Sequence, residues 1–323
     1  MLLCVLNKNT FMNISLTQLE YILAIDTYRH FAKAADACLV TQPTLSMQLK
    51  KLEEELKINI FDRSKQPIIP TDAGKQLIEQ ARIILREAKK LEQIAKHFDD
   101  TFEGSLTIGI IPTLAPYLLP YFLGDFLKKY KKIKLIIQEL TTDEIIFKLN
   151  KDELDVGILA TPLHENNLIE EPLFYEEIKV FAHYNHPLTK KKILEHDDIL
   201  RDDIWMLSQG NCFRSQVINI CANPIKMNEQ LKYESGSIET LKKMVEMEGG
   251  FTLLPELAVL ELSTKKLNQV AEFKKPKPLR EVSLVYARSV SKKKFIDVLK
   301  KIIISSVPED LLNKKRGAVV EWK

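Results

Sequence analysis

Residues 41–56 read TQPTLSMQLKKLEEEL, and this stretch is typical of one amphipathic helix. Thr41 can cap the helix, and Pro43 suits its first turn. Shorter apolar stripes precede it within 19–25 and 31–38. Together the three stripes predict a helix-turn-helix. The apolar face of the last helix recurs every three or four residues, at Leu45, Leu49, Leu52 and Leu56.

The exposed start of this helix would carry short polar side chains. Amides and hydroxyls at a helix N-terminus can reach base edges and phosphates in a major groove of DNA. The alternative is a three-helix bundle whose polar face is only solvated. The formal net charge of the chain is +3, so bulk charge does not favour either interpretation. The candidate DNA-binding residues are Gln42, Pro43, Thr44, Ser46, Gln48, Lys50 and, further along, Arg63.

A wing and a long helix are expected next. Residues 58–70 place Ile60, Phe61, Ile68 and Ile69 around polar residues and two prolines, which suits two short strands. From Thr71 to about Phe98, apolar residues spaced three and four apart form a seam for another helix. Such a helix spans about 40 Å, too long for a small domain to cover, so we expect a second copy of the chain to pack there. We assign residues 12–71 to a winged helix-turn-helix domain and 72–103 to a dimerising linker helix.

The composition fits a globular protein with several units. A chain of 323 residues predicts two or three compact units, and 45% hydrophobic with 28% charged residues is the balance of a folded domain. The sequence has no apolar run of membrane-spanning length and no signal peptide. We therefore expect a cytoplasmic protein with no membrane partner. Residues 1–11 are interpreted as an extraneous leader, with Met12 as an alternative start.

Beyond Glu103-Gly104 the pattern changes to alternating strands and helices, which implies a mostly parallel sheet flanked by helices, an α/β fold. We assign residues 104–306 to an effector domain of two subdomains, about 105–173 with 275–305, and about 174–274. Residues 307–323 are expected to form a polar tail. The expected elements are 106–111, 117–130, 133–139, 142–148 and 156–159, then 178–183, 204–207, 240–246, 251–254, 282–286 and 292–304.

The four cysteines are too few for a secreted disulfide scaffold, and neither they nor the six histidines have the spacing of a metal site. We expect no metal and no cofactor. Cys212 opens an apolar-periodic segment near a helix N-terminus, with Arg214 two residues on, and both features would lower its pKa. Cys221 is interpreted as a buried, less acidic thiol and Cys38 as a core thiol; Cys4 lies in the leader.

The nine-residue separation of Cys212 and Cys221 has a physical consequence if it is helical. The two residues would be about 13 Å apart along the helix, whereas a disulfide needs Cα atoms within roughly 7 Å. A bond between them would therefore unwind the helix, which would make the pair a switch. The alternative is two unrelated cysteines, one buried and one incidental.

The head contains LEY at 19–21, FAKAA at 31–35, QPTLS at 42–46, LEEEL at 52–56 and TDAG at 71–74. With these motifs it resembles the winged helix-turn-helix of LysR-type transcriptional regulators. The resemblance implies a head that dimerises through the linker helix and docks its third helix in operator DNA. RNA polymerase would be a further partner.

The effector region contains GIIPTLAPYLLP at 109–120, CFRSQ at 212–216, SIETL at 237–241 and GGFTLLP at 249–255. It resembles the peroxide-sensing members of the same family, which implies a periplasmic-binding-protein-like domain in a homo-oligomer, either a dimer or a homotetramer built as a dimer of dimers. By this resemblance Cys212 is the peroxidatic thiol, Cys221 resolves it as a disulfide, and glutaredoxin or thioredoxin resets the switch. Asn211 replaces a histidine found in some members, and Thr141 is an alternative to Thr142. The implied peroxide pocket comprises Pro112, Thr113, Thr142, Gln216 and Arg280.

Two other functions remain open. An ordinary LysR-type regulator would bind a small metabolite in the cleft between its subdomains, and peroxide would not alter its DNA complex. A thiol peroxidase would consume peroxide far beyond stoichiometry when given a thiol reductant. The winged head argues against an enzyme, and we expect a regulator.

Overall fold

The computed structural model describes residues 14–96, 103–221 and 236–321. The chain divides into two compact units, Met1–Asp100, called the head here, and Thr101–Lys323, called the effector unit. The leader at 1–11, with Cys4, lies outside the described residues.

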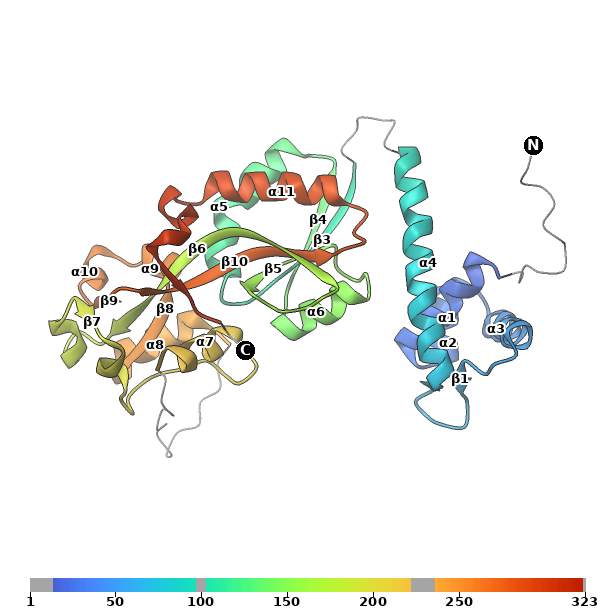
Figure 1. The fold of residues 1–323 in the computed structure, drawn as a ribbon, viewed down its shortest axis with the longest axis horizontal. Helices are drawn as coiled ribbons and strands as arrows, with labels where there is room; N and C mark the ends of the chain where they lie inside the picture. The colour runs from blue at the N-terminus through green and yellow to red at the C-terminus, as the bar shows by residue number, and fades with distance from the viewer. Residues whose placement is uncertain (1–13, 97–102, 222–235, 322–323) are drawn as a thin grey trace. The chain divides into compact units, whose positions relative to one another are not determined.

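The head is helical with a small wing (Figure 1). Ser15 caps the first helix through a capping box with Gln18. At the start of the third helix the Thr41 hydroxyl accepts from the Thr44 amide, so Thr41 caps this helix as expected. The wing is two antiparallel strands of two residues each. The elements are α1 (Leu16–Tyr28), α2 (Phe31–Ala37), α3 (Gln42–Leu56), β1 (Phe61–Asp62), β2 (Ile69–Pro70) and α4 (Asp72–Lys96).

One apolar cluster holds the head together, and it contains the predicted leucines of α3. The sequence did not reveal the buried ion pair in which Arg82 of α4 donates to Asp26 of α1 at 2.7 Å, with both residues under 10% exposed. Cys38 is the C-cap residue of α2 and is only partly buried. The expectation of a core thiol is therefore wrong, because Cys38 packs at the margin of the apolar cluster and not inside it. The ion pair ties α1 to the long helix α4.

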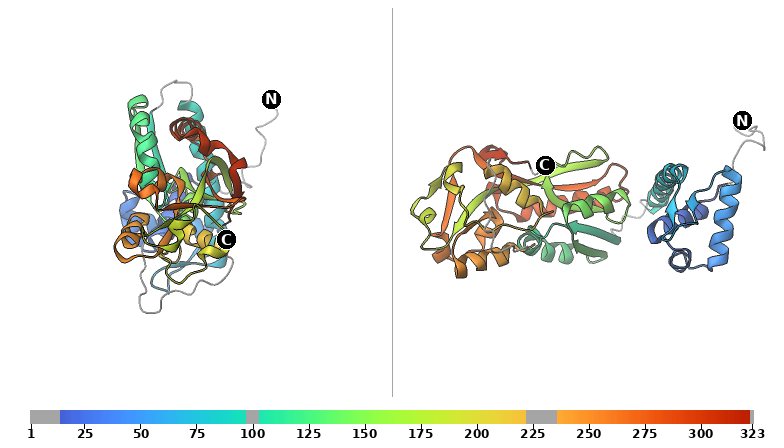
Figure 2. Two further views of the ribbon diagram at one scale, coloured as in Figure 1. Left: turned by 90° about the vertical axis from the view of Figure 1, so that its left-hand side faces the viewer. Right: turned by 90° about the horizontal axis from the view of Figure 1, so that it is seen from below.

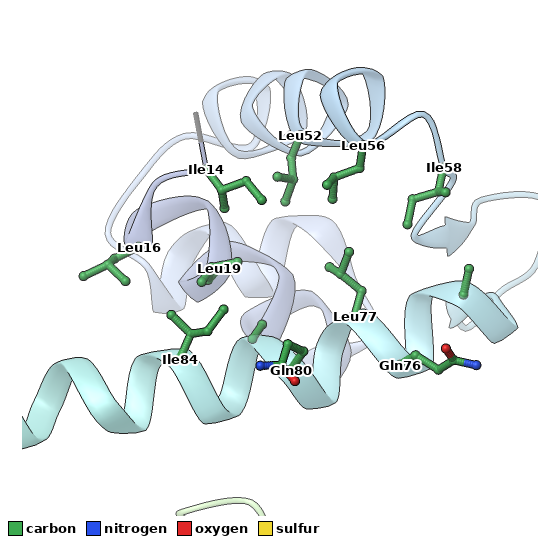
Figure 3. Close-up of a pocket in the computed structure, with 12 residues that line it drawn as sticks. Ile14, Leu16, Leu19, Leu52, Leu56, Ile58, Gln76, Leu77, Gln80 and Ile84 are labelled. Atoms are coloured by element: carbon green, nitrogen blue, oxygen red, sulfur yellow. The ribbon is translucent and has the colours of Figure 1, made fainter. Parts of the chain in front are cut away.

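An open apolar groove lies between α1, α3 and α4 (Figure 3). Its volume is about 510 Å³, and aliphatic side chains from all three helices point into it. The same side of α4 leaves Ile84 40% exposed, and Leu91 further along is 69% exposed. Apolar surface therefore continues along the helix. The groove is lined by Ile14, Leu16, Leu19, Leu52, Leu56, Ile58, Ala73, Gln76, Leu77, Gln80, Ala81 and Ile84.

The effector unit is built on one continuous sheet in the order β4-β3-β5-β10-β6-β9-β7, with β8 on β6 and β11 on β10. β3, β4 and β5 run parallel, as expected for an α/β fold. The strands are β3 (Gly104–Ile110), β4 (Ile133–Glu139), β5 (Val156–Thr161), β6 (Leu168–Ala182), β7 (Ile193–Leu194), β8 (Phe251–Pro255), β9 (Val270–Phe273), β10 (Lys277–Ala287) and β11 (Gly317–Val319).

Helices cover this sheet on both faces. In Figure 1, α11 lies above the strands with α5 beside it, whereas α6 lies below them; Figure 2 gives two further views. The helices are α5 (Ala115–Lys129), α6 (Thr142–Asn150), α7 (Cys212–Cys221), α8 (Ile238–Glu248), α9 (Glu256–Leu260), α10 (Thr264–Leu267) and α11 (Lys293–Ser306), with short 3-10 turns η1 (Pro187–Lys190), η2 (His196–Ile199), η3 (Glu309–Leu312) and η4 (Lys314–Arg316).

Two antiparallel strands join the halves of the effector unit. β6 and β10 pair from Leu168 to Glu177, so β6 crosses the expected subdomain boundary at 173/174 without a break. Only the end of β6 was expected as a strand. The element expected at 204–207 is reduced to a single bridge between Ile204 and Phe251. One apolar core runs through both halves.

The expected polar tail is instead folded onto the effector unit. β11 pairs in parallel with β10, and Leu311 is buried. Leu311 joins the apolar core and Val320 packs against it, while the backbone of the last residues hydrogen-bonds to β10. Across the described ranges, no helix is long and apolar enough to cross a membrane.

Candidate functional site

Helix α7 begins at Cys212 and ends at Cys221, so the separation of the two thiols is helical, which is the condition on which the argument for a switch depends. Both side chains are buried, and neither forms a disulfide. Nine helical residues place the two ends about 13 Å apart, beyond the roughly 7 Å that a disulfide allows. The two sulfurs can meet only if α7 unwinds.

Two buried polar side chains, Thr142 and Gln216, lie around Cys212. Thr142, the first residue of α6, is 3% exposed, and its hydroxyl is a neighbour of the Cys212 thiol. Gln216 is fully buried one turn after Cys212, and thus on the same side of α7. Among the described residues, Thr142 Oγ1 has no hydrogen-bond partner besides the Cys212 thiol, and Gln216 Oε1 is buried without one. Such atoms cost free energy unless a ligand or water satisfies them.

The adjacent threonine has a different role. Thr141 is exposed and caps α6 through a capping box with Glu144. The choice between Thr141 and Thr142 therefore falls on Thr142 for a position beside the thiol. A sequence pattern could not separate them, because either can cap the helix.

Arg280 supplies the cationic side of the site. It is fully buried on β10, and its Nη1 donates to Thr113 Oγ1 at 3.0 Å. Its Nε donates to Glu176 Oε1 at 2.7 Å, and its guanidinium carbon lies 5.2 Å from the centre of the Phe213 ring. Pro112, beside Thr113, is partly exposed. The structure thus brings Thr113, Arg280 and Phe213, the residue after Cys212, together.

Sequence reasoning missed Glu176. Its second oxygen accepts from the Leu257 amide at 3.1 Å. Burial raises the pKa of Glu176, while Arg280 opposes that shift. The available signal was the acidic pair Glu176-Glu177, which has apolar residues directly before and after it.

The pKa of Cys212 is shifted upward, whereas the sequence predicted a lowered pKa. Burial raises its pKa above the ordinary value, although the Thr142 hydroxyl, the Arg280 charge and the backbone amides at the start of α7 lower it. Arg214 was expected to supply the positive charge, but it donates to the Leu207 carbonyl at 2.7 Å, and the charge that lowers the pKa belongs to Arg280. Burial also raises the pKa of Cys221 to about 11, and this thiol is buried as expected.

The predicted DNA-binding residues lie at the surface of the head. Gln42, Pro43 and Lys50 are exposed on α3. The next three polar positions, Thr44, Ser46 and Gln48, are partly exposed.

Arg63 of the wing is already held by other residues. It donates to Glu53 at 2.7 Å and lies over the Phe31 ring, yet 44% of its side chain remains exposed. A polar row along α3 with a basic residue in the wing can contact a long, charged partner.

Two family models match the chain. The one described as bacterial regulatory helix-turn-helix protein, lysR family, matches residues 16–75. The one described as LysR substrate binding domain matches residues 99–301. This chain belongs to the LysR family. LysR proteins are transcriptional regulators, which are not an enzyme class. No group of three or more His, Cys, Asp or Glu residues in the described part of this LysR chain is placed to hold a metal ion.

Curated relatives of this LysR chain include a hydrogen peroxide-inducible genes activator of Pectobacterium carotovorum subsp. carotovorum, 36% identical over 84% of this chain and 90% of the relative. The DNA-binding transcriptional dual regulator OxyR of Escherichia coli is 36% identical, over 84% and 89%.

Solved structures are similar as well. A full-length OxyR variant from Pseudomonas aeruginosa matches with a TM-score of 0.75 and 32% identity, covering 92% of this chain and 99% of that one. An OxyR mutant from Corynebacterium glutamicum with hydrogen peroxide bound matches with a TM-score of 0.59 and 29% identity, over 90% and 92%. Both structural matches thus include most of the head and the effector unit.

Proposed function

We propose that this LysR-family protein is a hydrogen-peroxide-responsive transcriptional regulator that switches through a disulfide between Cys212 and Cys221. The observation that carries the proposal is a buried thiol at the start of a helix, beside the Thr142 hydroxyl that favours its thiolate and the buried Gln216 Oε1 that has no hydrogen-bond partner. The relatives named as peroxide-inducible activators, and the similar structure that holds peroxide, support the same ligand.

Peroxide suits the polar atoms of this site. Each of its oxygens can donate one hydrogen bond and accept others, so it needs partners of both kinds. Gln216 Oε1 can accept from it, and the Thr142 hydroxyl can donate or accept. Thr113, held by Arg280 at 3.0 Å, offers a second hydroxyl. The Arg280 charge favours the negative charge that develops as the O–O bond breaks.

The chemistry consumes one peroxide and two thiols. The Cys212 thiolate attacks one peroxide oxygen, the O–O bond breaks, and the sulfur becomes a sulfenic acid. The hydroxide that leaves takes the proton given up by the thiol and becomes water. The Cys221 sulfur then attacks the sulfenic sulfur, the S–O bond breaks, and a second water leaves. Glutaredoxin or thioredoxin, each a dithiol, would return both cysteines to thiols and become oxidised.

Oxidation would alter DNA binding through a conformational change. The disulfide cannot form on intact α7, so the helix and its surroundings refold when it closes. Refolding would change how effector units pack in a dimer of dimers, and hence the spacing of the heads on operator DNA in the cytoplasm. RNA polymerase would respond to that spacing.

A second copy of the chain is the occupant we propose for the groove of the head. The groove and the exposed aliphatic side chains of α4 form continuous apolar surface along one helix. Such a seam fits the same helix of another copy. Sedimentation velocity of the full chain should give dimers or tetramers, and a monomer would contradict this arrangement.

The test of the proposed function compares Cys212→Ser with the wild-type protein on promoter DNA. We expect both to bind DNA, and only the wild type to change its mobility and footprint after peroxide. Cys38→Ser is the matched control, because it removes a thiol of the head, and it should respond as the wild type does. A Cys212→Ser protein that still responds, or a wild type that responds only to a metabolite, would refute the thiol mechanism.

A further inference from the structure

The last residues of the structure form a strap, defined here as residues 313–321, which lies beyond the stretch matched by the LysR substrate binding domain, residues 99–301. The strap comprises η4 and β11 and runs along β10. Its end lies beside α7 (Figure 1). No part of the proposed chemistry accounts for it.

The strap is fixed to β10 by its backbone. Gly317 pairs with Lys277, and the Val320 amide donates to the Leu279 carbonyl at 2.9 Å. A Cβ atom at Gly317 would lie 2.0 Å from the Lys277 carbonyl oxygen, so only glycine allows this close approach. The pairing places the strap one residue from Arg280, which belongs to the proposed site.

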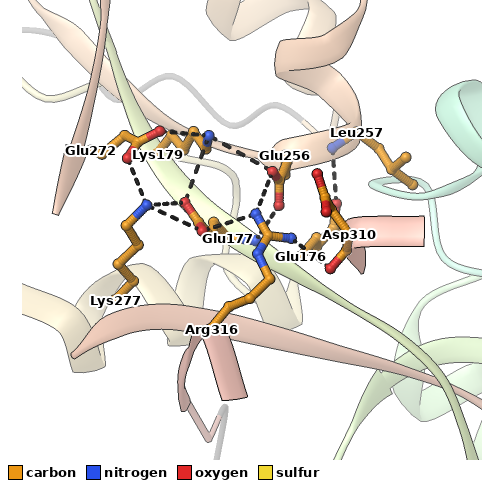
Figure 4. A network of polar contacts seen from close by, with 9 residues as sticks. All are labelled: Glu176, Glu177, Lys179, Glu256, Leu257, Glu272, Lys277, Asp310 and Arg316. Carbon is orange, nitrogen blue, oxygen red and sulfur yellow. Dashed lines mark hydrogen bonds and ion pairs between the residues drawn. The ribbon is translucent and has the colours of Figure 1, made fainter. Parts of the chain in front are cut away.

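Ion pairs fix the strap at its other end (Figure 4). Arg316 Nη2 lies 2.9 Å from Glu177 Oε1 and 2.7 Å from Glu256 Oε1. Both glutamates are under 10% exposed, and Lys277 also binds Glu177. Without Arg316 the two buried glutamates would lose a cation where little water can replace it. The contact therefore depends on the positive charge of Arg316.

The strap ends on the helix that carries the two thiols. Gln216 Nε2 donates to the Val320 carbonyl at 2.9 Å, and Asn219 Nδ2 donates to the Glu321 carbonyl at 2.7 Å. Both donors lie between the two cysteines of α7. Because an amide is planar, fixing its nitrogen also fixes the direction of Gln216 Oε1, the buried acceptor that has no partner.

We propose that the strap is a positioning element of the sensor site, which orients Gln216 toward peroxide and holds α7 helical until Cys212 is oxidised. The inference rests on the proposed function. It predicts opposite effects on the two chemical steps. A loosened strap should slow the attack of Cys212 on peroxide, because Gln216 loses its orientation. It should speed closure of the disulfide, because α7 unwinds more easily.

The experiment measures the two steps separately in the full chain. Sulfenic acid formation is followed by mass spectrometry in a Cys221→Ser background, and disulfide closure is followed with Cys221 present. Arg316→Ala and Gly317→Val both loosen the strap. We expect sulfenic acid formation to be about two- to fivefold slower and disulfide closure to be faster by a similar factor, because such a factor corresponds to the loss of one hydrogen bond. Lys315→Ala is the matched control, since Lys315 is exposed and carries the same charge.

Asn219→Ala is the gentler variant, because Asn219 is exposed and its change leaves the Gln216 bond in place. It should leave the first step unchanged and speed only the second. Unchanged rates in all strap variants, or equal slowing of both steps, would overturn the inference. A wild type that does not react with peroxide would instead overturn the proposed function, so the two failures are distinguishable.

Discussion

The head and the effector unit place their candidate functional side chains in opposite ways. In the head, Gln42 and Lys50 lie in solvent on the outer face of α3. In the effector unit, Cys212, Thr142 and Gln216 are buried. A surface row suits a partner as large as DNA, which is recognised by shape and charge. A buried site suits a molecule as small as peroxide, because desolvation and a few polar atoms decide whether it binds and reacts.

The ion pairs of the two units differ in burial in the same way. The Lys50–Glu54 pair of the head is 3.7 Å apart with both side chains about two-thirds exposed, at 69% and 67%. The Arg280–Glu176 pair of the effector unit has no exposed surface. Exposed pairs contribute little to stability, whereas removing one member of a buried pair leaves a charge without solvent.

The largest effect is expected from Glu176→Ala. Losing this carboxylate leaves the Arg280 charge buried, which costs about 3–5 kcal/mol of unfolding free energy. Urea unfolding followed by tryptophan fluorescence would measure it, since Trp205 lies in the effector unit. Glu54→Ala, followed by circular dichroism, should leave the stability of the head unchanged. Equal losses for the two variants would contradict the contrast between them.

The next effect is that of pH. Burial raises the pKa of Cys212 above its ordinary value, so the thiol is protonated at neutral pH and the thiolate fraction grows about tenfold per unit of pH. The rate of oxidation by peroxide, measured by mass spectrometry, should therefore rise about a hundredfold from pH 6 to pH 8. DNA binding by the reduced protein should change much less, because amides and hydroxyls do not titrate there. A flat rate profile would mean that the thiolate is already formed at pH 6.

A smaller effect is expected from Thr142→Val, which keeps the shape of the side chain and removes the hydroxyl beside Cys212. The rate of sulfenic acid formation should fall about tenfold, because the variant loses both a partner for peroxide and a group that favours the thiolate. Thr142→Ser keeps the hydroxyl and should recover most of the rate. If the valine variant reacts as fast as the wild type, Thr142 does not belong to the peroxide site.

The smallest effect is expected in the head, from Lys50→Ala. One phosphate contact should be lost, which weakens binding to every DNA sequence by about two- to tenfold and lowers the slope of affinity against salt by about one. Fluorescence anisotropy at several salt concentrations measures both quantities. Lys128→Ala removes the same charge from an exposed position of the effector unit and should have no effect. Similar losses in both variants would indicate that only net charge matters.

Local patterns were sufficient to predict the helices of the head and most of the effector elements. The periodicity of α3 and the caps at Ser15 and Thr41 depend on residues a few positions apart, so the sequence carries them directly. The same holds for α7, whose helical spacing of two thiols follows from consecutive residues. The first part of β6 was missed because four glutamates interrupt its apolar pattern. Glu170 and Glu171 are partly buried, and tertiary contacts bury Glu176 and Glu177.

Only the tertiary structure decided which residues far apart in the chain come into contact. Arg280 meets Glu176 across 104 positions, and Gln216 meets the carbonyl of Val320 across another 104. It also decided which of two neighbouring threonines is buried, and that Arg280 rather than Arg214 acts on the thiol. A local pattern cannot contain such information, because burial and charge at one point depend on every segment that packs there.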